Sequence, residues 1–167
     1  MSLIYNKAYF RHVTFLLIAF VFIITITDTC QVKAKDPVNL EQTKVQIELF
    51  REALDNFGAS SPEQVINIWI KGVKGRNGAL HYAVACHELK QKFVEEWGEP
   101  KESLWVYGTS SPWLYKHEVV YSRKLSDVEY EVKLKYFWHT STGLAEPTET
   151  VLRIVRTGDI WCVQDVK

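Results

Sequence analysis

The feature that most constrains this 167-residue chain is a change in the spacing of its apolar residues near position 104. Before this point, apolar side chains recur every three or four residues, as on one face of a helix. After it, they alternate with polar side chains, which is the pattern of a half-buried strand. Helices followed by alternating strands predict an α+β domain, in which helices pack on one face of an antiparallel sheet.

Three helices are expected before the change. The first covers residues 40–57 and has Leu49 in its apolar stripe. The second begins at Ser61, a residue type that caps helices, and has Pro62 at its first helical position. The third covers about residues 79–97 and ends before a glycine.

Four or so strands are expected after the change. The clearest is 128–139, whose even-numbered residues are apolar and whose charged odd-numbered residues face solvent. It follows a strand at 113–125, in which we expect one apolar side to contain Tyr115, His117, Val119 and Tyr121. Strands at 148–156 and 160–166, joined by a tight turn at Gly158, complete a curved sheet against the three helices.

A hydrophobic segment precedes this domain. Residues 13–27 carry no charge and follow the basic residues Lys7 and Arg11. As a helix this segment would span roughly 22 Å, which is shorter than the ~30 Å hydrocarbon core of a membrane. The pattern favours a signal peptide over residues 1–34, with cleavage after Ala34.

The alternative is an uncleaved anchor that contacts the membrane through residues 13–27. Lipidation at Cys30 has little support, because the preceding residues lack the small apolar pattern of a lipoprotein signal. Each interpretation places the folded domain outside the cytoplasm, since the positive charge lies before the segment. The expected organisation is residues 1–34 as signal or anchor, 35–39 as linker and 40–167 as one domain.

Two cysteines, Cys86 and Cys162, remain after cleavage. In an exported domain they either form a disulfide or serve as two small buried apolar residues, and the sequence leaves both alternatives open. No Cys-x-x-Cys motif or paired Cys/His spacing occurs, and His81 and His87 point to different faces of one helix. The sequence therefore predicts no metal site and no cofactor.

Charge and composition limit the partners. Residues 35–167 carry 17 basic and 19 acidic residues, without the clustered basic face that nucleic-acid binding needs. Aromatic residues make up 13% of the chain, which is enough to line a pocket or an interface as well as to fill a core. We therefore expect a small apolar molecule or an envelope protein as partner, and no nucleic acid.

The element order over residues 40–167, the change near residue 104 and the closing strand Gly158–Val163 resemble the nuclear transport factor 2-like superfamily, which includes the ketosteroid isomerases. The resemblance implies a cone fold, and small exported members often follow a signal or anchor in the same way. Enzymatic members place a carboxylate or His, with a Tyr, inside the cone. Here Glu129 and Glu131 fall on the polar side of their strand, which departs from that pattern.

Seven residues of the strands are candidates for lining a ligand cavity. Their aromatic and imidazole side chains suit either an apolar binding wall or the packing of a sheet on helices. If buried, the histidine among them would also suit a general base beside a tyrosine. The candidates are Trp113, Tyr115, His117, Tyr121, Tyr130, Tyr136 and Trp138.

The function that these features favour is a non-catalytic exported domain at the cell envelope, which binds a small apolar ligand or a protein partner. One alternative is a module that forms a homodimer through its sheet, and exposed Phe137 and Val120 would favour it. A second alternative is a proton-transfer enzyme, of isomerase or dehydratase type, that uses His117 and a tyrosine.

Overall fold

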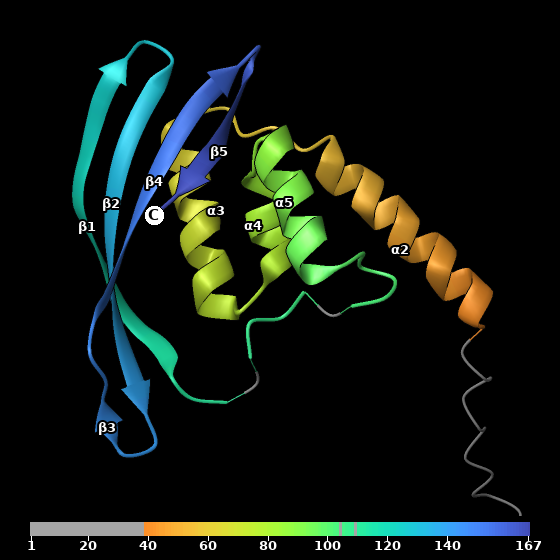
Figure 1. Ribbon diagram of the computed structural model, residues 1–167, viewed down its shortest axis with the longest axis horizontal. Coiled ribbons are helices and arrows are strands. Elements are labelled where there is room, and N and C mark those ends of the chain that lie inside the picture. The colour runs from red at the N-terminus through yellow and green to blue at the C-terminus, as the bar shows by residue number, and fades with distance from the viewer. Residues whose placement is uncertain (1–38, 104, 109) are drawn as a thin grey trace, which may run out of the picture. The chain divides into compact units, whose positions relative to one another are not determined.

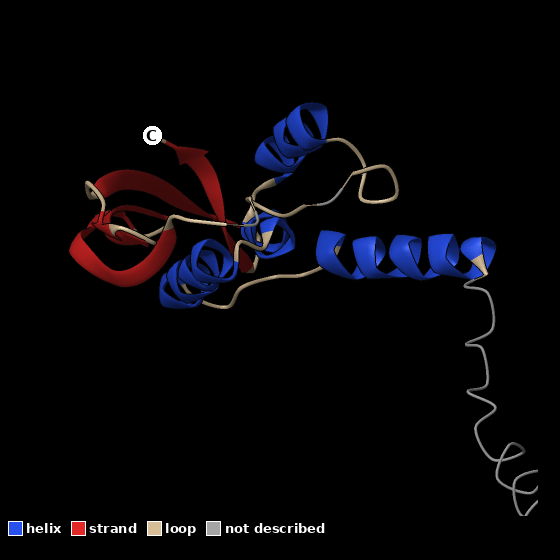
Figure 2. Ribbon diagram, turned by 90° about the horizontal axis from the view of Figure 1, so that it is seen from below, coloured by secondary structure: helices blue, strands red, loops and turns tan. Residues whose placement is uncertain are grey.

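A helical layer packs against one face of a curved antiparallel sheet (Figures 1 and 2). The computed structural model describes residues 39–103, 105–108 and 110–167, so the predicted signal or anchor segment lies outside the described residues. The α+β fold and the curved antiparallel sheet are confirmed for the unit Leu40–Lys167. No helix in the described ranges is long and apolar enough to cross a membrane.

Four helices are present in the described residues, where the sequence predicted three. They are α2 (Leu40–Asp55), α3 (Pro62–Gly75), α4 (Gly78–Val84) and α5 (His87–Trp97). The predicted third helix is divided because Ala85 and Cys86 have extended backbone. The strand that contains Val163 causes this break, since Cys86 N–H donates to the Val163 carbonyl at 2.8 Å and Ala85 bridges the same residue.

Helix α3 begins as the sequence predicts. The Ser61 hydroxyl accepts a hydrogen bond from the Gln64 N–H at 3.2 Å, and Pro62 occupies the first turn. The Gln64 side chain accepts from the Ser60 N–H at 2.7 Å, so side chains satisfy two backbone N–H groups near the helix start.

Over the described ranges the sheet has five strands, where the sequence predicted four or so. They are β1 (Trp113–Ser126), β2 (Glu129–Thr140), β3 (Gly143–Leu144), β4 (Thr148–Thr157) and β5 (Ile160–Val166). Their order is β1-β2-β4-β5, and the extra strand β3 is a two-residue piece that pairs with the end of β2. The predicted turn at Gly158 is confirmed, with a positive φ of 63° that glycine adopts without strain.

The core lies between α3 and the sheet. Alternation along β2 is confirmed, because Val132, Leu134 and Tyr136 are buried. They cluster with residues of β4 and β5 and with buried side chains of α3, which include Val65 and Trp69.

Strand β1 does not follow the predicted alternation. Register shifts between Leu114 and Lys116, and between Val119 and Tyr121, turn successive parts of the strand to opposite faces. His117 is paired with Tyr136 and so faces the helices, but it is exposed because the helical layer does not cover it. The prediction that these residues form one buried apolar side was wrong, since bulges have no clear signature in the sequence.

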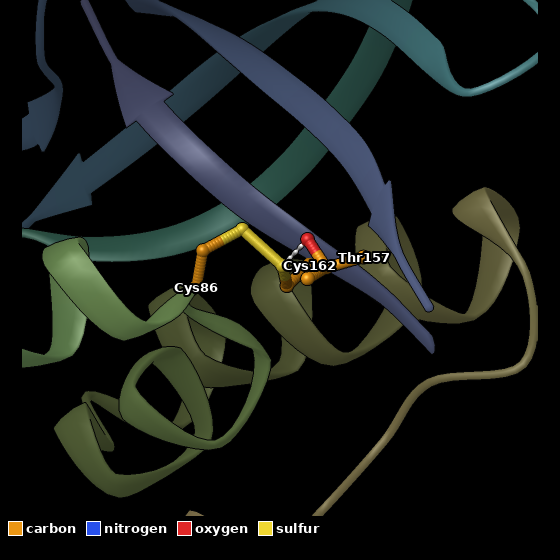
Figure 3. The surroundings of a disulfide bond; sticks show 3 residues. All are labelled: Cys86, Thr157 and Cys162. Carbon is orange, nitrogen blue, oxygen red and sulfur yellow. Dashed lines mark hydrogen bonds between the residues drawn. A yellow bond between two sulfur atoms is a disulfide. The ribbon is translucent and has the colours of Figure 1, made fainter. Parts of the chain in front are cut away.

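The structure contains the disulfide that the sequence left open. It joins Cys86, directly before α5, to Cys162 on β5 (Figure 3). The Thr157 hydroxyl lies 3.9 Å from the Cys162 sulfur. The bond therefore ties the break in the helical layer to the edge strand of the sheet.

Candidate functional site

An aromatic pocket lies between α3, α4, α5 and the sheet. Its volume is about 530 Å³. Larger hollows, of about 830 and 780 Å³, lie beside α2 and α5, but charged side chains line much of each. Six aromatic rings line the pocket of about 530 Å³: Trp69, Phe93, Trp97, Tyr107, Tyr136 and Trp138. Aromatic side chains therefore make up much of the lining of this pocket.

The rings come from elements that are distant in sequence. Helix α3 supplies Trp69, α5 supplies Phe93 and Trp97, and β2 supplies Tyr136 and Trp138. Helical spacing places the two α5 residues on one face, with ring centroids 5.8 Å apart. Strand alternation places the two β2 residues on the face toward the helices.

His81, on α4, is a buried titratable group of this site. Its Nε2 lies 3.0 Å from the Trp69 carbonyl oxygen, which only accepts, so Nε2 carries the proton. The Nδ1 atom of the neutral ring then accepts from the Tyr107 hydroxyl at 2.8 Å. Burial lowers the pKa of His81 to about 4, against the opposing effect of the Trp69 hydrogen bond. The imidazole is therefore neutral at pH 7.

Gly72 makes this arrangement possible. The imidazole stacks on the Trp69 ring with centroids 4.0 Å apart, and it approaches the backbone of α3 directly. A Cβ atom at Gly72 would lie 2.4 Å from Cδ2 of His81. The absence of a side chain at this position is what lets α4 bring its histidine against α3.

Tyr136 has a buried hydroxyl with no hydrogen-bond partner in the described residues. Burial raises its pKa to about 12, and the Trp69 side chain opposes this rise. An indole N–H only donates, so Trp69 cannot accept the phenol proton. Unlike the Tyr136 hydroxyl, the Trp138 indole N–H has a hydrogen-bond partner, because it donates to the Thr148 hydroxyl at 2.8 Å.

Only two of the seven candidates from the sequence, Tyr136 and Trp138, line this pocket. Tyr130 is half-buried and packs edge-on against Trp161, with ring centroids 5.6 Å apart. His117 lies exposed on β1, so the burial on which its alternative role as a general base depended is not present.

The other three candidates lie on or near the outer face of the sheet. Trp113 contacts His139, Tyr115 contacts Phe137 and His139, and the Tyr121 hydroxyl donates to Glu131 at 3.0 Å. The register shifts in β1 separate these residues from the pocket.

The residues that sequence reasoning missed lie on helices or in the loop before β1. The sequence does not distinguish four of them from residues that only pack the fold, because helical spacing does not show which rings surround a cavity. They are Trp69, Phe93, Trp97 and Tyr107. The apolar spacing of α3 was the available signal for Trp69. For His81 the sequence raises only the question of metal ligation, and it predicts none. In the described part of the chain, no three His, Cys, Asp or Glu side chains gather to hold a metal ion.

Comparisons with known proteins add little to this geometry. No family model matches the chain, and no curated protein matches it. A solved structure with partial similarity is that of a SEC-C motif containing protein from Rhodopseudomonas palustris. The two are 9% identical with a TM-score of 0.35, and the match covers 66% of this chain and 80% of that one. A likeness at this level supports no conclusion about the fold or function of this chain.

Proposed function

We propose that the domain of residues 40–167 is a non-catalytic binding domain for a small apolar molecule, which occupies the aromatic pocket. The observation that carries this proposal is the ring of six aromatic side chains around about 530 Å³. Rings from three separate elements converge on one space, as they do where an apolar ligand is enclosed. The resemblance to the cone fold agrees with a site between helices and sheet.

The state of His81 supports binding over catalysis. A general base works best with a pKa near the working pH, whereas the pKa of His81 is about 4. Both ring nitrogens already have partners, in the Trp69 carbonyl and the Tyr107 hydroxyl. The imidazole therefore acts as a fixed part of the pocket wall.

The proposal includes a place of action outside the cytoplasm, at the cell envelope. It rests on the hydrophobic segment at residues 13–27 with its preceding basic residues.

The test is equilibrium dialysis of the full-length chain with 2-naphthamide, a neutral two-ring compound. We expect micromolar affinity that is lost, by at least tenfold, in Val73→Trp, because the new indole fills the pocket beside Trp69. Val45→Trp is the matched control, since Val45 is 53% exposed on α2 and lies outside the pocket. No binding by the unmodified chain, or equal loss in both variants, would refute the proposal.

A second candidate is self-association through the outer face of the sheet. Trp113 and Tyr115 are 43% and 54% exposed there, and they form a cluster with Phe137 and His139. The free edge of β1 is interrupted by register shifts and carries charged residues, so pairing of two copies edge to edge is disfavoured. A second copy would therefore bind to the outer face of the sheet, where these aromatic residues are exposed. Sedimentation equilibrium should then show a dimer that Tyr115→Glu dissociates; a monomer at high concentration would exclude it.

A further inference from the structure

One arginine that lines the aromatic pocket forms no ion pair with an acidic residue in the described part of the chain. Four of the five arginines in the described ranges, Arg51, Arg123, Arg153 and Arg156, form ion pairs with Asp or Glu. The fifth, Arg76, forms none with the described residues. Its Nη2 donates to the Pro112 carbonyl at 2.5 Å, which leaves donors of the guanidinium available.

The position of Arg76 is fixed by the end of α3. The residue has left-handed backbone, with φ 53° and ψ 35°, and its N–H bonds back to carbonyls of Gly72 and Val73. Its own carbonyl accepts from the Tyr107 N–H at 3.0 Å. The guanidinium is thus held in place by the same segments that supply the pocket walls, and little ordering is needed when it binds a ligand.

Arg76 also lies where two different environments meet. On one side it lines the aromatic pocket with Trp69 and Trp138. On the other it lines an open hollow of about 720 Å³, whose lining includes Ser111 and Ser141 as well as Trp113. A molecule whose apolar body lies in the first space can place a polar end beside the Arg76 guanidinium.

We propose that the ligand of the aromatic pocket is a small aromatic or alicyclic carboxylate, whose ring lies among the aromatic walls and whose carboxylate binds the Arg76 guanidinium. This inference rests on the proposed function. A planar carboxylate matches the planar fork of a guanidinium, and such charge-assisted bonds are stronger than neutral ones. Glu96 also lines the pocket, so a second negative charge on the ligand is disfavoured and a monoanion fits best.

The test compares 2-naphthoate with its neutral isostere 2-naphthamide, by equilibrium dialysis with the full-length chain at neutral pH. We expect naphthoate to bind about tenfold more tightly. In Arg76→Gln this ratio of affinities should fall to about one, and in Arg76→Lys it should stay above one. Lys74→Gln is the matched control, because Lys74 loses the same charge from the last turn of α3 without lining either space, and it should keep the full ratio.

The results separate the two proposals. Binding of naphthamide without tighter binding of naphthoate would overturn the carboxylate assignment and leave the proposed function standing. A ratio unchanged in Arg76→Gln would also overturn it. Binding of neither compound would refute both. If Arg76→Gln does not fold, because the bond to Pro112 is lost, the unmodified chain decides. Its ratio should fall severalfold between low and high salt, and a ratio that salt does not change would contradict an ion pair.

Discussion

Helices α2 and α3 are similar in length and apolar spacing, but the fold uses them differently. α3 buries six of its 14 residues against the sheet and α4, whereas none of the 16 residues of α2 is buried. On α2, Leu49 is 59% exposed and Phe50 is 71% exposed. Figures 1 and 2 show α2 lying away from the sheet. An apolar stripe therefore shows which face of a helix is suited to burial, and the rest of the fold decides whether anything covers it.

The contacts that hold the two helices also differ in kind. Apolar packing and the stacked His81 ring hold α3. Polar contacts near its C-terminal end hold α2. Lys90 donates to the Leu54 and Asp55 carbonyls at 2.8 and 3.1 Å, and the Tyr82 hydroxyl donates to the Asp55 carboxylate at 2.5 Å. Arg51 pairs with Glu99.

The largest expected effect tests this contrast directly. Ile66→Ala on α3 should lower the free energy of unfolding by about 2–5 kcal/mol, because Ile66 is only 8% exposed and its loss leaves a cavity. Leu49→Ala on α2 should change it by less than about 0.5 kcal/mol, since the side chain is already in solvent. Urea denaturation of both variants measures the two values. A loss of 2 kcal/mol or more in Leu49→Ala would mean that something covers α2 in solution.

The same contrast explains how far the sequence could predict the fold. Periodicity identified α2, α3 and the long strands, and residue chemistry placed the start of α3 at Ser61. Neither kind of pattern could show the break in the helix at Ala85, because its cause is the hydrogen bond from Cys86 to Val163, far along the chain. Nor could these patterns show that the helical layer leaves α2 uncovered, since nothing in the stripe of α2 reports on its neighbours.

The same reasoning predicted two of the six aromatic rings of the pocket. Tyr136 and Trp138 were found because a regular strand fixes which side chains share a face. Tyr115 was misplaced because a bulge in β1 shifts that alternation, whereas His117 faces the helices but lies outside the area that the helical layer covers. Trp69 and His81 meet only through the packing of α4 on α3, which local sequence does not encode.

The next effect concerns the buried imidazole against α3. The unfolded chain protonates His81 near pH 6.5, whereas the folded pKa is about 4. Between these values the unfolded state binds more protons, so stability is full above pH 6.5 and falls as the pH drops toward 4. The shift corresponds to roughly 3 kcal/mol. Urea denaturation at a series of pH values should show this loss, and His87→Asn should retain it.

An NMR titration of the His81 ring protons gives an independent reading. We expect the midpoint near pH 4. A midpoint above 6 would show that the ring is solvated, and that α3 lacks the dry contact with α4 which distinguishes it from α2.

A smaller effect tests how closely α4 approaches α3. Gly72→Ala should destabilise the protein by about 1–3 kcal/mol, because the added methyl group would overlap the His81 ring. Gly75→Ala, three residues later on the same helix, meets nothing nearer than 3.9 Å and should stabilise by up to about 1 kcal/mol. Thermal unfolding distinguishes the two signs. If both substitutions stabilise, the ring does not lie against α3.

The smallest effect concerns α2 alone. Lys90 is buried and its pKa is lowered by that burial, with Asp55 opposing the shift, so its hydrogen bonds to the last carbonyls of α2 form at some desolvation cost. Lys90→Met keeps the apolar stem and removes these bonds. We expect a local loss of about 1 kcal/mol, or about fivefold faster amide exchange along α2, while the amides of α3 keep their protection.

Lys92→Met is the control for this last variant, because Lys92 is exposed on the same helix and makes none of the hydrogen bonds to α2 that Lys90 makes in the described structure. Hydrogen exchange followed by mass spectrometry resolves the two helices. Equal exchange of α2 in Lys90→Met and in the unmodified chain would show that polar contacts do not order this helix. Ordering of α2 would then require a partner that covers its exposed apolar stripe, as the sheet and α4 cover that of α3.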